Sequence, residues 1–242
     1  MISVCIATYN GAAYIEEQLE SILSQLTEQD EVIVSDDAST DDTVAVIESF
    51  RDKRVRILHH TPYAQSRFPL DKSTHNFENA LREAKGDYIF FSDQDDVWLP
   101  NKVSAMVEAL QTADLAVHDC QVVDSSLQLL RPSYFDYIHV HKGILYNIWR
   151  SSCLGCCMAF RRSIGQAALP FPPSFVAHDQ WLVMVANLRG KVAIVRQPLI
   201  LYRKHNLSQT TSGSKSRYSL AFKLWYRVVV SYYTCIKWLR IY

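Results

Sequence analysis

Three carboxylates lie within four positions of the chain, at Asp93, Asp95 and Asp96, directly after an apolar run over residues 88–91. Carboxylates so close together repel one another, and such a cluster is favoured where a cation or several hydrogen-bond donors lie among them. The preceding run is typical of a buried strand, and ligands of α/β sheets bind beyond the carboxyl ends of strands. The pattern therefore predicts a divalent-metal site at a sheet edge. The alternative is a solvated turn that caps the helix expected from about Asn101.

The segments around this cluster alternate between strands and helices. Apolar, β-rich runs predict strands over residues 2–7, 32–34, 54–58, 88–91, 115–119, 155–160, 192–195 and 199–202. Helical spacing of apolar residues predicts helices over residues 14–26, 44–50, 77–84, 101–112 and 177–188. Residues 59–73 are polar, aromatic and proline-bearing, which predicts a long functional loop. The alternation indicates βαβ units and a parallel sheet with right-handed crossovers, whose strand ends should bind a nucleotide or another phosphorylated ligand.

The composition predicts one large domain with an appended tail, since the chain has 242 residues, of which 48% are hydrophobic. Its 25 basic and 25 acidic side chains balance, but Asp179 is the last acidic residue, and 11 of the basic residues follow it. Residues 218–242 interleave aromatic and basic side chains with imperfect helical periodicity. This segment predicts either a helix on an anionic membrane surface or a helix that packs on the domain.

No apolar stretch reaches the roughly 20 residues that span a bilayer, and the first residues lack the basic segment of a signal sequence. We therefore expect a cytoplasmic protein, attached peripherally to the inner face of the membrane if residues 218–242 bind lipid. The six cysteines have apolar neighbours, which predicts reduced core residues. The group Cys153, Cys156 and Cys157 lacks a second ligand pair at a zinc spacing, so it is a weak metal signal.

Four segments in a fixed order resemble one enzyme family. They are residues 3–11 (SVCIATYNG), 34–41 (VSDDASTD), 93–98 (DQDDVW) and 177–181 (AHDQW). Together they resemble the family 2 glycosyltransferases of the GT-A fold, and more narrowly the bacterial enzymes that build surface polysaccharide. The resemblance implies an α/β fold with a Rossmann-like, mostly parallel central sheet flanked by helices. It also implies a domain over residues 1–206, with a nucleotide-sugar-binding half (1–98) and an acceptor-binding half (99–206). The composition of residues 207–242 predicts a basic, aromatic, helical tail after that domain.

At the donor site the resemblance implies roles for five residues. Thr8, Tyr9 and Asn10 would contact the nucleotide, together with Asp93, which would face the ribose or a metal-bound water. Asp37 would hydrogen-bond the edge of a uracil or thymine base.

The resemblance also implies a divalent cation, with Asp95 as its direct ligand, Asp93 beside it, and Asp96 as a supporting residue or helix cap. Oxygen ligands suit Mn²⁺ or Mg²⁺ better than zinc. His205 would contact the metal or a phosphate, and Arg203 and Lys204 would pair with phosphate.

On the acceptor side the resemblance implies that Asp179 is the catalytic base of an inverting transfer. One carboxylate suffices there, because the leaving diphosphate needs a metal rather than a general acid. An N-cap role for Asp179 stays open, and the two roles can coexist. His118, Asp119, His178 and Trp181 are the acceptor-binding candidates.

These expectations describe a metal-dependent hexosyl- or rhamnosyltransferase. It would move a sugar from a UDP- or dTDP-sugar to a hydroxyl of a glycan or lipid-linked glycan, with no nucleic-acid partner. Two alternatives stay open: a nucleotidyltransferase on the same scaffold, and a non-catalytic glycan-binding or scaffold protein derived from such an enzyme. Residues 8–11 lack the glycine-rich phosphate loop that a nucleotidyltransferase needs, and no Gly-X-Gly-X-X-Gly segment supports a dehydrogenase.

Overall fold

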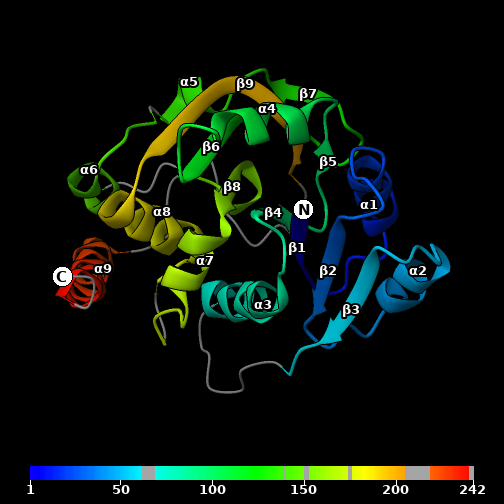
Figure 1. Ribbon diagram of the computed structural model, residues 1–242, viewed down its shortest axis with the longest axis horizontal. Helices are drawn as coiled ribbons and strands as arrows, with labels where there is room; N and C mark the ends of the chain where they lie inside the picture. The colour runs from blue at the N-terminus through cyan, green and yellow to red at the C-terminus, as the bar shows by residue number, and fades with distance from the viewer. Residues whose placement is uncertain (62–68, 139, 150–152, 174–175, 205–218, 240–242) are drawn as a thin grey trace.

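The computed structural model describes residues 1–61, 69–138, 140–149, 153–173, 176–204 and 219–239. Within these ranges one mixed sheet runs through the centre of the molecule (Figure 1). Its strands are β1 (Ile2–Thr8), β2 (Glu31–Asp36), β3 (Val55–His59), β4 (Tyr88–Asp93), β5 (Val97–Trp98), β6 (Leu115–Val123), β7 (Leu129–Arg131), β8 (Met158–Arg161) and β9 (Val192–Arg203). Their order is β3-β2-β1-β4-β8-β6-β9-β5, with β7 paired to β6.

The first four strands form the parallel half of the sheet. β1 pairs with β2 and β4, and β2 pairs with β3. The crossovers are α1 (Ile15–Leu23), α2 (Thr43–Ser49) and α3 (Pro69–Glu83), which confirms the predicted βαβ units. The predicted loop over residues 59–73 is too long at its end, and its residues 62–68 lie outside the described residues. α3 already begins at Pro69, a residue that is well tolerated in the first turn of a helix.

The second half of the sheet is not purely parallel. β8 lies antiparallel between β4 and β6, whereas β9 runs parallel to β6 and antiparallel to β5. β9 is one long strand where two short ones were expected. Between the two expected strands the pairing of β9 with β6 shifts in register: His118 pairs with Val195, whereas Asp119 pairs with Pro198. Pro198 has no N–H to donate to a neighbouring strand, so proline is tolerated at such a break in the regular pairing.

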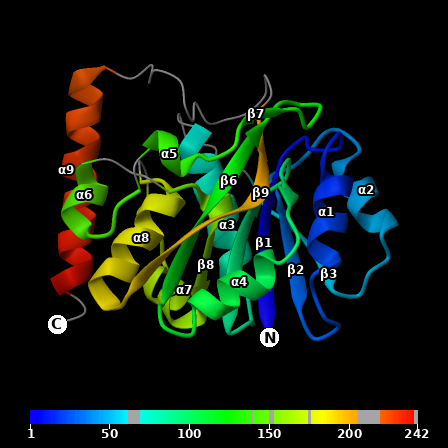
Figure 2. The same ribbon diagram turned by 90° about the horizontal axis from the view of Figure 1, so that it is seen from above.

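Helices cover both faces of the sheet (Figures 1 and 2). α1, α2 and α4 (Lys102–Ala109) lie on one face, and α3, α7 (Arg162–Ala168) and α8 (His178–Arg189) lie on the other. Two short helices, α5 (Phe135–Ile138) and α6 (Ile144–Trp149), and a 3₁₀ turn at Gly155–Cys157 belong to the second half. The core between sheet and helices is rich in aromatic rings, including the fully buried Phe77, Phe90, Phe91 and Phe160.

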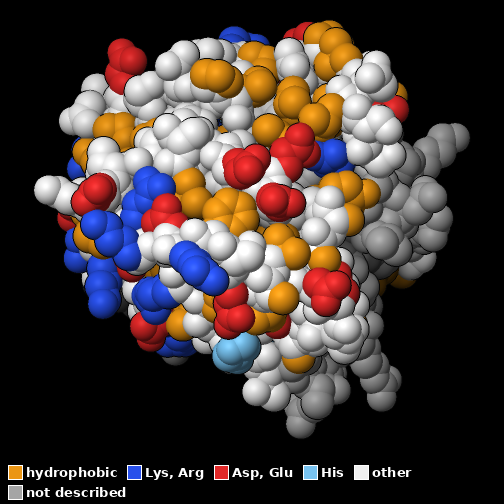
Figure 3. Space-filling model, turned by 90° about the vertical axis from the view of Figure 1, so that its right-hand side faces the viewer, with side chains coloured by type: hydrophobic (Ala, Val, Ile, Leu, Met, Phe, Trp, Pro, Cys, Tyr) orange, Lys and Arg blue, Asp and Glu red, His pale blue; other side chains and the backbone are white. Residues whose placement is uncertain are grey.

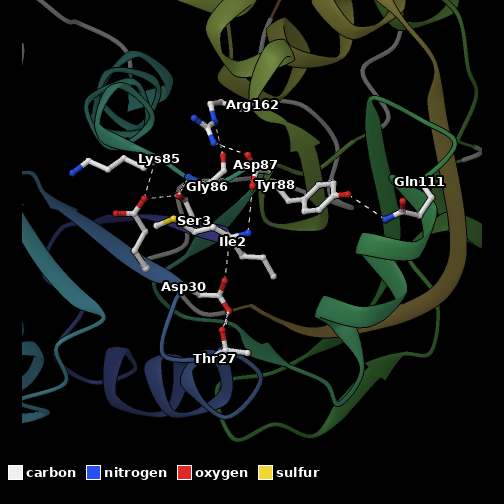
Figure 4. A network of polar contacts seen from close by, with 12 residues as sticks. Ile2, Ser3, Thr27, Asp30, Lys85, Gly86, Asp87, Tyr88, Gln111 and Arg162 are labelled. Carbon is white, nitrogen blue, oxygen red and sulfur yellow. Dashed lines mark hydrogen bonds and ion pairs between the residues drawn. The ribbon is translucent and has the colours of Figure 1, made fainter.

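Hydrogen bonds fasten the amino ends of β1 and β4, at the edge opposite to the acidic cluster (Figure 4). Asp30 accepts from the Ile2 N–H at 2.7 Å and from the Thr27 hydroxyl at 2.8 Å. The Gly86 N–H donates to the Ser3 hydroxyl at 2.7 Å. A Cβ on Gly86 would lie only 2.4 Å from the Ser3 backbone nitrogen, so this approach requires glycine. The strands are thus anchored at one edge and carry their loops at the other.

The last described helix, α9 (Leu220–Leu239), packs on α6 and α8 (Figure 2). Val230 and Thr234 are buried against the domain, as the packing alternative predicted. The other side of α9 is exposed and apolar. It presents Leu224, Trp225, Val228, Tyr232, Trp238 and Leu239. None of the helices described is both long enough and apolar enough to cross a membrane.

Candidate active site

The candidate site lies where β1, β2 and β4 end. Strand register places Thr8 opposite Asp36 of β2, and Ala7 opposite Asp93 of β4. Parallel strands bring their carboxyl ends to the same edge, so loops that are far apart in the sequence meet there. The segments that contain Thr8, Asp37 and Asp93 are therefore neighbours, as the sequence predicted.

Gln94 joins the loop after β1 to the loop after β4. Its side-chain oxygen accepts from the Tyr9 N–H at 2.8 Å, and its side-chain nitrogen donates to the Tyr9 carbonyl at 3.1 Å. A Cβ on Gly11 would lie 2.4 Å from the Gln94 side-chain oxygen, so the glycine makes room for the amide. The middle residue of Asp93-Gln94-Asp95 thus holds the Tyr9 loop, while the Tyr9 side chain stays 51% exposed at the mouth of the site.

The loop after β2 is fixed by its own carboxylates. Asp36 is buried and accepts from Thr8 and Ser39, so it organises the loop rather than facing a ligand. Asp37 lies 2.8 Å from the His60 ring nitrogen Nδ1. Asn10 accepts from the Thr40 N–H at 2.8 Å.

The acidic cluster is arranged as a candidate metal site. Carboxylate oxygens of Asp93 and Asp96 and the Cys156 sulfur lie within 4.8 Å of one another. Burial raises the pKa of Asp93 to about 7, with a further contribution from the charge of Asp95 and a smaller one from that of Asp179. Burial and the charges of Asp95 and Asp93 raise the pKa of Asp96 well above its usual range.

One oxygen of the fully buried Asp96 has no hydrogen-bond partner among the described residues. An orphaned carboxylate oxygen among mutually repelling acids fits a hard divalent cation, which prefers oxygen ligands. His205, the third expected metal contact, lies outside the described residues.

Arg203 has a different role from the expected phosphate contact. It is 4% exposed, and its guanidinium donates to the carbonyls of Asp95 and Ser125 at 2.8 Å and forms an ion pair with Glu17. Its backbone N–H donates to Asp96 at 3.1 Å. Because these donors already have protein partners, Arg203 holds the acidic loop in place instead of binding phosphate. The sequence showed the position of Arg203 but not its contacts.

A buried lysine beneath the acidic loop was missed in the sequence. Lys102 is fully buried in the first turn of α4, donates to the Cys156 carbonyl at 2.8 Å and lies 4.1 Å from the centre of the Trp98 ring. Burial lowers its pKa to about 8, and the charges of Asp96 and Asp93 act against that shift. A lysine four residues after the tryptophan of DQDDVW was the available signal. It supplies a fixed positive charge near the acids.

Asp179 lies in the first turn of α8, where its carboxylate accepts from the Gln180 N–H at 2.6 Å. The N-cap residue of α8 is Ala177. Asp179 therefore lies within the helix, and the alternative that it is the N-cap residue is wrong. Burial raises the pKa of Asp179 to about 6. A carboxyl whose pKa is raised by burial and whose charge acts on Asp93 of the acidic cluster has the properties of a general base.

His178 lies beside Asp179 with its ring in an apolar setting. It is 9% exposed, its ring centre lies 4.3 Å from that of Phe77, and neither ring nitrogen has a hydrogen-bond partner among the described residues. Burial lowers the pKa of His178 to about 3, so the imidazole is neutral. A Cβ on Gly155 would lie 2.4 Å from its Nε2, which explains the glycine in that turn. His178 therefore remains a candidate for acceptor contact.

The three other acceptor candidates are also buried. His118 is fully buried and its Nδ1 lies 2.6 Å from the Asp119 carbonyl. Asp119 accepts from the backbone N–H groups of Tyr134 and Phe135 at 2.9 Å, which fixes the start of α5. Trp181 is buried and donates its ring N–H to the Ala168 carbonyl at 2.8 Å. The sequence placed these residues near strand and helix ends but could not show that their polar atoms face inward.

Five of the six cysteines are buried and all six are free, as the apolar neighbours predicted. Cys156 does more than fill the core, because its sulfur lies beside the carboxylates of the acidic cluster.

Comparison with known proteins gives a consistent result. The family model described as Glycosyl transferase family 2 matches residues 3–167. The chain is 28% identical to the dTDP-rhamnosyl transferase RfbG of Shigella flexneri, over 93% of this chain and 82% of that protein. It is 29% identical to the UDP-Glc:alpha-D-GlcNAc-diphosphoundecaprenol beta-1,3-glucosyltransferase WfgD of Escherichia coli, over 88% of this chain and 80% of that protein.

Solved structures share the fold. S. aureus TarS 1–349 in complex with UDP-GlcNAc matches with a TM-score of 0.69 at 22% identity, over 95% of this chain and 66% of that chain. The mannosyltransferase PcManGT of Pyrobaculum calidifontis in complex with GDP-Man and Mn²⁺ matches with a TM-score of 0.61 at 21% identity, over 98% of this chain and 64% of that chain. The chain thus spans about two thirds of each solved chain, and at these identities the likeness concerns the fold.

Proposed function

Since the chain belongs to glycosyl transferase family 2, we propose that it is an inverting glycosyltransferase of bacterial surface-polysaccharide synthesis. Its donor is a UDP- or dTDP-sugar, and its acceptor is a hydroxyl of a glycan. Two relatives support these donor classes, since one is named for dTDP-rhamnosyl transfer and another for UDP-Glc. The observation that carries the proposal is the carboxylate of Asp179 on α8, whose charge acts on Asp93 of the acidic cluster after β4.

In this mechanism Asp179 removes the proton from the acceptor hydroxyl. The hydroxyl oxygen forms a bond to the anomeric carbon while the bond from that carbon to the diphosphate oxygen breaks, and the electron pair leaves with the diphosphate. Asp93, Asp95 and Asp96 would hold Mn²⁺ or Mg²⁺, which neutralises charge on a leaving diphosphate. The raised pKa of Asp179 suits a base that works near neutral pH.

The nucleotide would lie across the loops after β1 and β2. Tyr9 offers an exposed aromatic ring, and the buried Asp37, whose carboxylate lies 2.8 Å from the His60 Nδ1, would contact the base edge. Thr8 and Asn10 support this surface through their bonds to the β2 loop.

We also propose that the acceptor is lipid-linked and that α9 contacts the bilayer that carries it. Among the relatives, WfgD is named for an acceptor attached to diphosphoundecaprenol. On α9, Leu224, Val228 and Tyr232 are spaced by four residues, so they form one exposed apolar stripe. Arg227 of the same helix lies 4.4 Å from the ring of Trp149, itself 65% exposed on the neighbouring α6.

The charge around this stripe suits an anionic surface, because no acidic residue occurs after Asp179. An amphipathic helix with basic and aromatic residues lies in the interface of such membranes. The opposite end of the molecule, over α1, α2 and β3, differs. There acidic and basic side chains are interspersed (Figure 3).

Calorimetric titration with UDP, dTDP and GDP, each with and without Mn²⁺, tests the donor site. We expect Mn²⁺-dependent binding of a pyrimidine diphosphate, which Asp95→Ala abolishes. Asp179→Asn should bind the same nucleotide as the wild type but should transfer sugar to an acceptor glycan far more slowly. A folded protein that binds none of the nucleotides would refute the proposal.

Sedimentation with vesicles tests the membrane contact. The wild type should bind vesicles that contain phosphatidylglycerol more strongly than pure phosphatidylcholine vesicles, and Val228→Glu should release it. Leu129→Glu is the matched control, because Leu129 is exposed on β7, away from α9. Equal binding by the wild type and Val228→Glu would contradict the contact.

A further inference from the structure

Tyr226 of α9 reaches the first turn of α8, the turn that contains Asp179. Its hydroxyl accepts from the Ala177 N–H at 3.3 Å and donates to the Gln180 side-chain oxygen at 2.8 Å. These two partners flank His178 and Asp179 in the sequence. One hydroxyl therefore bridges the residues on either side of the candidate base.

The partners of Tyr226 are themselves fixed. Gln180 is 2% exposed, and its side-chain nitrogen donates to the Asn147 carbonyl of α6 at 2.8 Å. Gln180 therefore lies between α6 and α9 and has a hydrogen bond to each of them. Its own N–H is the donor to the Asp179 carboxylate. A displacement of Gln180 would thus move a group that directly contacts the base.

The start of α8 has few other supports. The first N–H groups of a helix have no partners within the helix and need acceptors from elsewhere. The Ala177 side chain offers no cap, so the acceptors come from other helices: the Tyr226 hydroxyl for Ala177, and the Thr74 hydroxyl of α3 for His178 at 3.2 Å. Loss of the Tyr226 hydroxyl would leave the Ala177 N–H and the Gln180 oxygen without this partner.

We propose that Tyr226 is a positioning residue for Asp179, and that α9 thereby links its exposed apolar stripe to the placement of the base. This inference rests on the proposed function, because it assigns the base role to Asp179. Tyr226 does not touch the reacting atoms. It holds the turn that presents the carboxylate, and a misplaced catalytic group costs rate even when substrates still bind.

The test compares Tyr226→Phe with the wild type and with Tyr233→Phe. The first substitution removes only the hydroxyl that joins α9 to α8. Tyr233→Phe also removes a tyrosine hydroxyl from α9, but the Tyr233 hydroxyl has no hydrogen bond among the described residues. Three quantities are measured for each protein: kcat for sugar transfer, the donor KM, and the Kd of the nucleoside diphosphate in the presence of Mn²⁺.

For Tyr226→Phe we expect kcat to fall roughly 10-fold to 100-fold, while the donor KM and the nucleotide Kd stay within about twofold of the wild type. Tyr233→Phe should match the wild type in all three. Amide hydrogen exchange supplies a readout that needs no turnover. The Ala177 amide should exchange faster in Tyr226→Phe than in the wild type, and at the wild-type rate in Tyr233→Phe.

Wild-type kcat and unchanged exchange at Ala177 in Tyr226→Phe would overturn the inference while leaving the proposed function intact. A parallel loss of kcat and nucleotide affinity would overturn it as well, because that pattern indicates general damage to the fold. A wild-type protein without any transfer activity would overturn the proposed function and this inference with it.

Discussion

Replacing Asp93 by asparagine should stabilise the metal-free protein at alkaline pH. Asp93 is half-buried beside Asp95, and burial together with neighbouring carboxylates raises its pKa from 3.8 to about 7. A carboxyl whose pKa is raised in the folded state favours folding only while it is protonated. Its contribution is fully present below the unfolded-state pKa, near pH 4, and is lost as the pH rises through about 7.

The magnitude follows from the shift. Each pKa unit corresponds to about 1.4 kcal/mol, so a shift of about three units would destabilise the ionised folded protein by up to about 4 kcal/mol. Partial solvent access screens the charges and reduces this value. We therefore expect Asp93→Asn to raise the free energy of unfolding by about 1–3 kcal/mol at pH 8, and to change it little at pH 4.5.

Urea denaturation at the two pH values, in the presence of EDTA, measures this difference. Asp52→Asn is the matched control, because the hydrogen bond from Arg54 lowers the pKa of Asp52 and the same substitution should therefore destabilise the protein at pH 8. Mn²⁺ should stabilise the wild type more than Asp93→Asn, since a bound cation relieves the repulsion. Equal or lower stability of Asp93→Asn at pH 8 would refute the reasoning.

Three further predictions concern the rest of the site. Burial raises the pKa of Asp179 to about 6, and a base acts only when deprotonated, so kcat should rise with pH and reach half its maximum near pH 6; Asp179→Asn should lower it by roughly 10²- to 10⁴-fold. Gly155→Ala forces a Cβ against the ring of His178, so urea denaturation should show a loss of about 1–3 kcal/mol. Arg203→Lys keeps the charge but loses the guanidinium hydrogen bonds to the carbonyls of Asp95 and Ser125. It should therefore lower the free energy of unfolding by about 2 kcal/mol and weaken Mn²⁺-dependent nucleotide binding. Wild-type stability or wild-type nucleotide affinity in Arg203→Lys would contradict the corresponding expectation.

The sequence predicts much of the fold because the early strands and helices have clear periodicities. The apolar run before Asp93 and the helical spacing of Ile15, Leu19 and Ile22 both gave elements that the structure contains. The two halves of β9 could not be joined from sequence, because Arg196 and Gln197 break the apolar pattern and only pairing with β6 keeps the strand continuous.

The candidate site is predictable in part for a similar reason. Asp93, Asp95 and Asp179 stand out by type and spacing. The direction of a side chain cannot be read from type and spacing. The sequence therefore could not show whether Arg203 faces the protein or a phosphate. The same holds for contacts between distant segments, such as that of Tyr226 with Ala177.

The interleaved order of the sheet decides how this enzyme could be recombined with its relatives. β8, from the second half of the chain, pairs with β4 of the first half, and Phe90 lies opposite Ala159. β5, from the first half, pairs with β9, and Val97 lies opposite Leu201. A chimera cut after residue 98 would therefore join two unmatched seams inside one sheet. Exchanging the second half of the chain between such enzymes requires that the strand pairs at both seams be transplanted together.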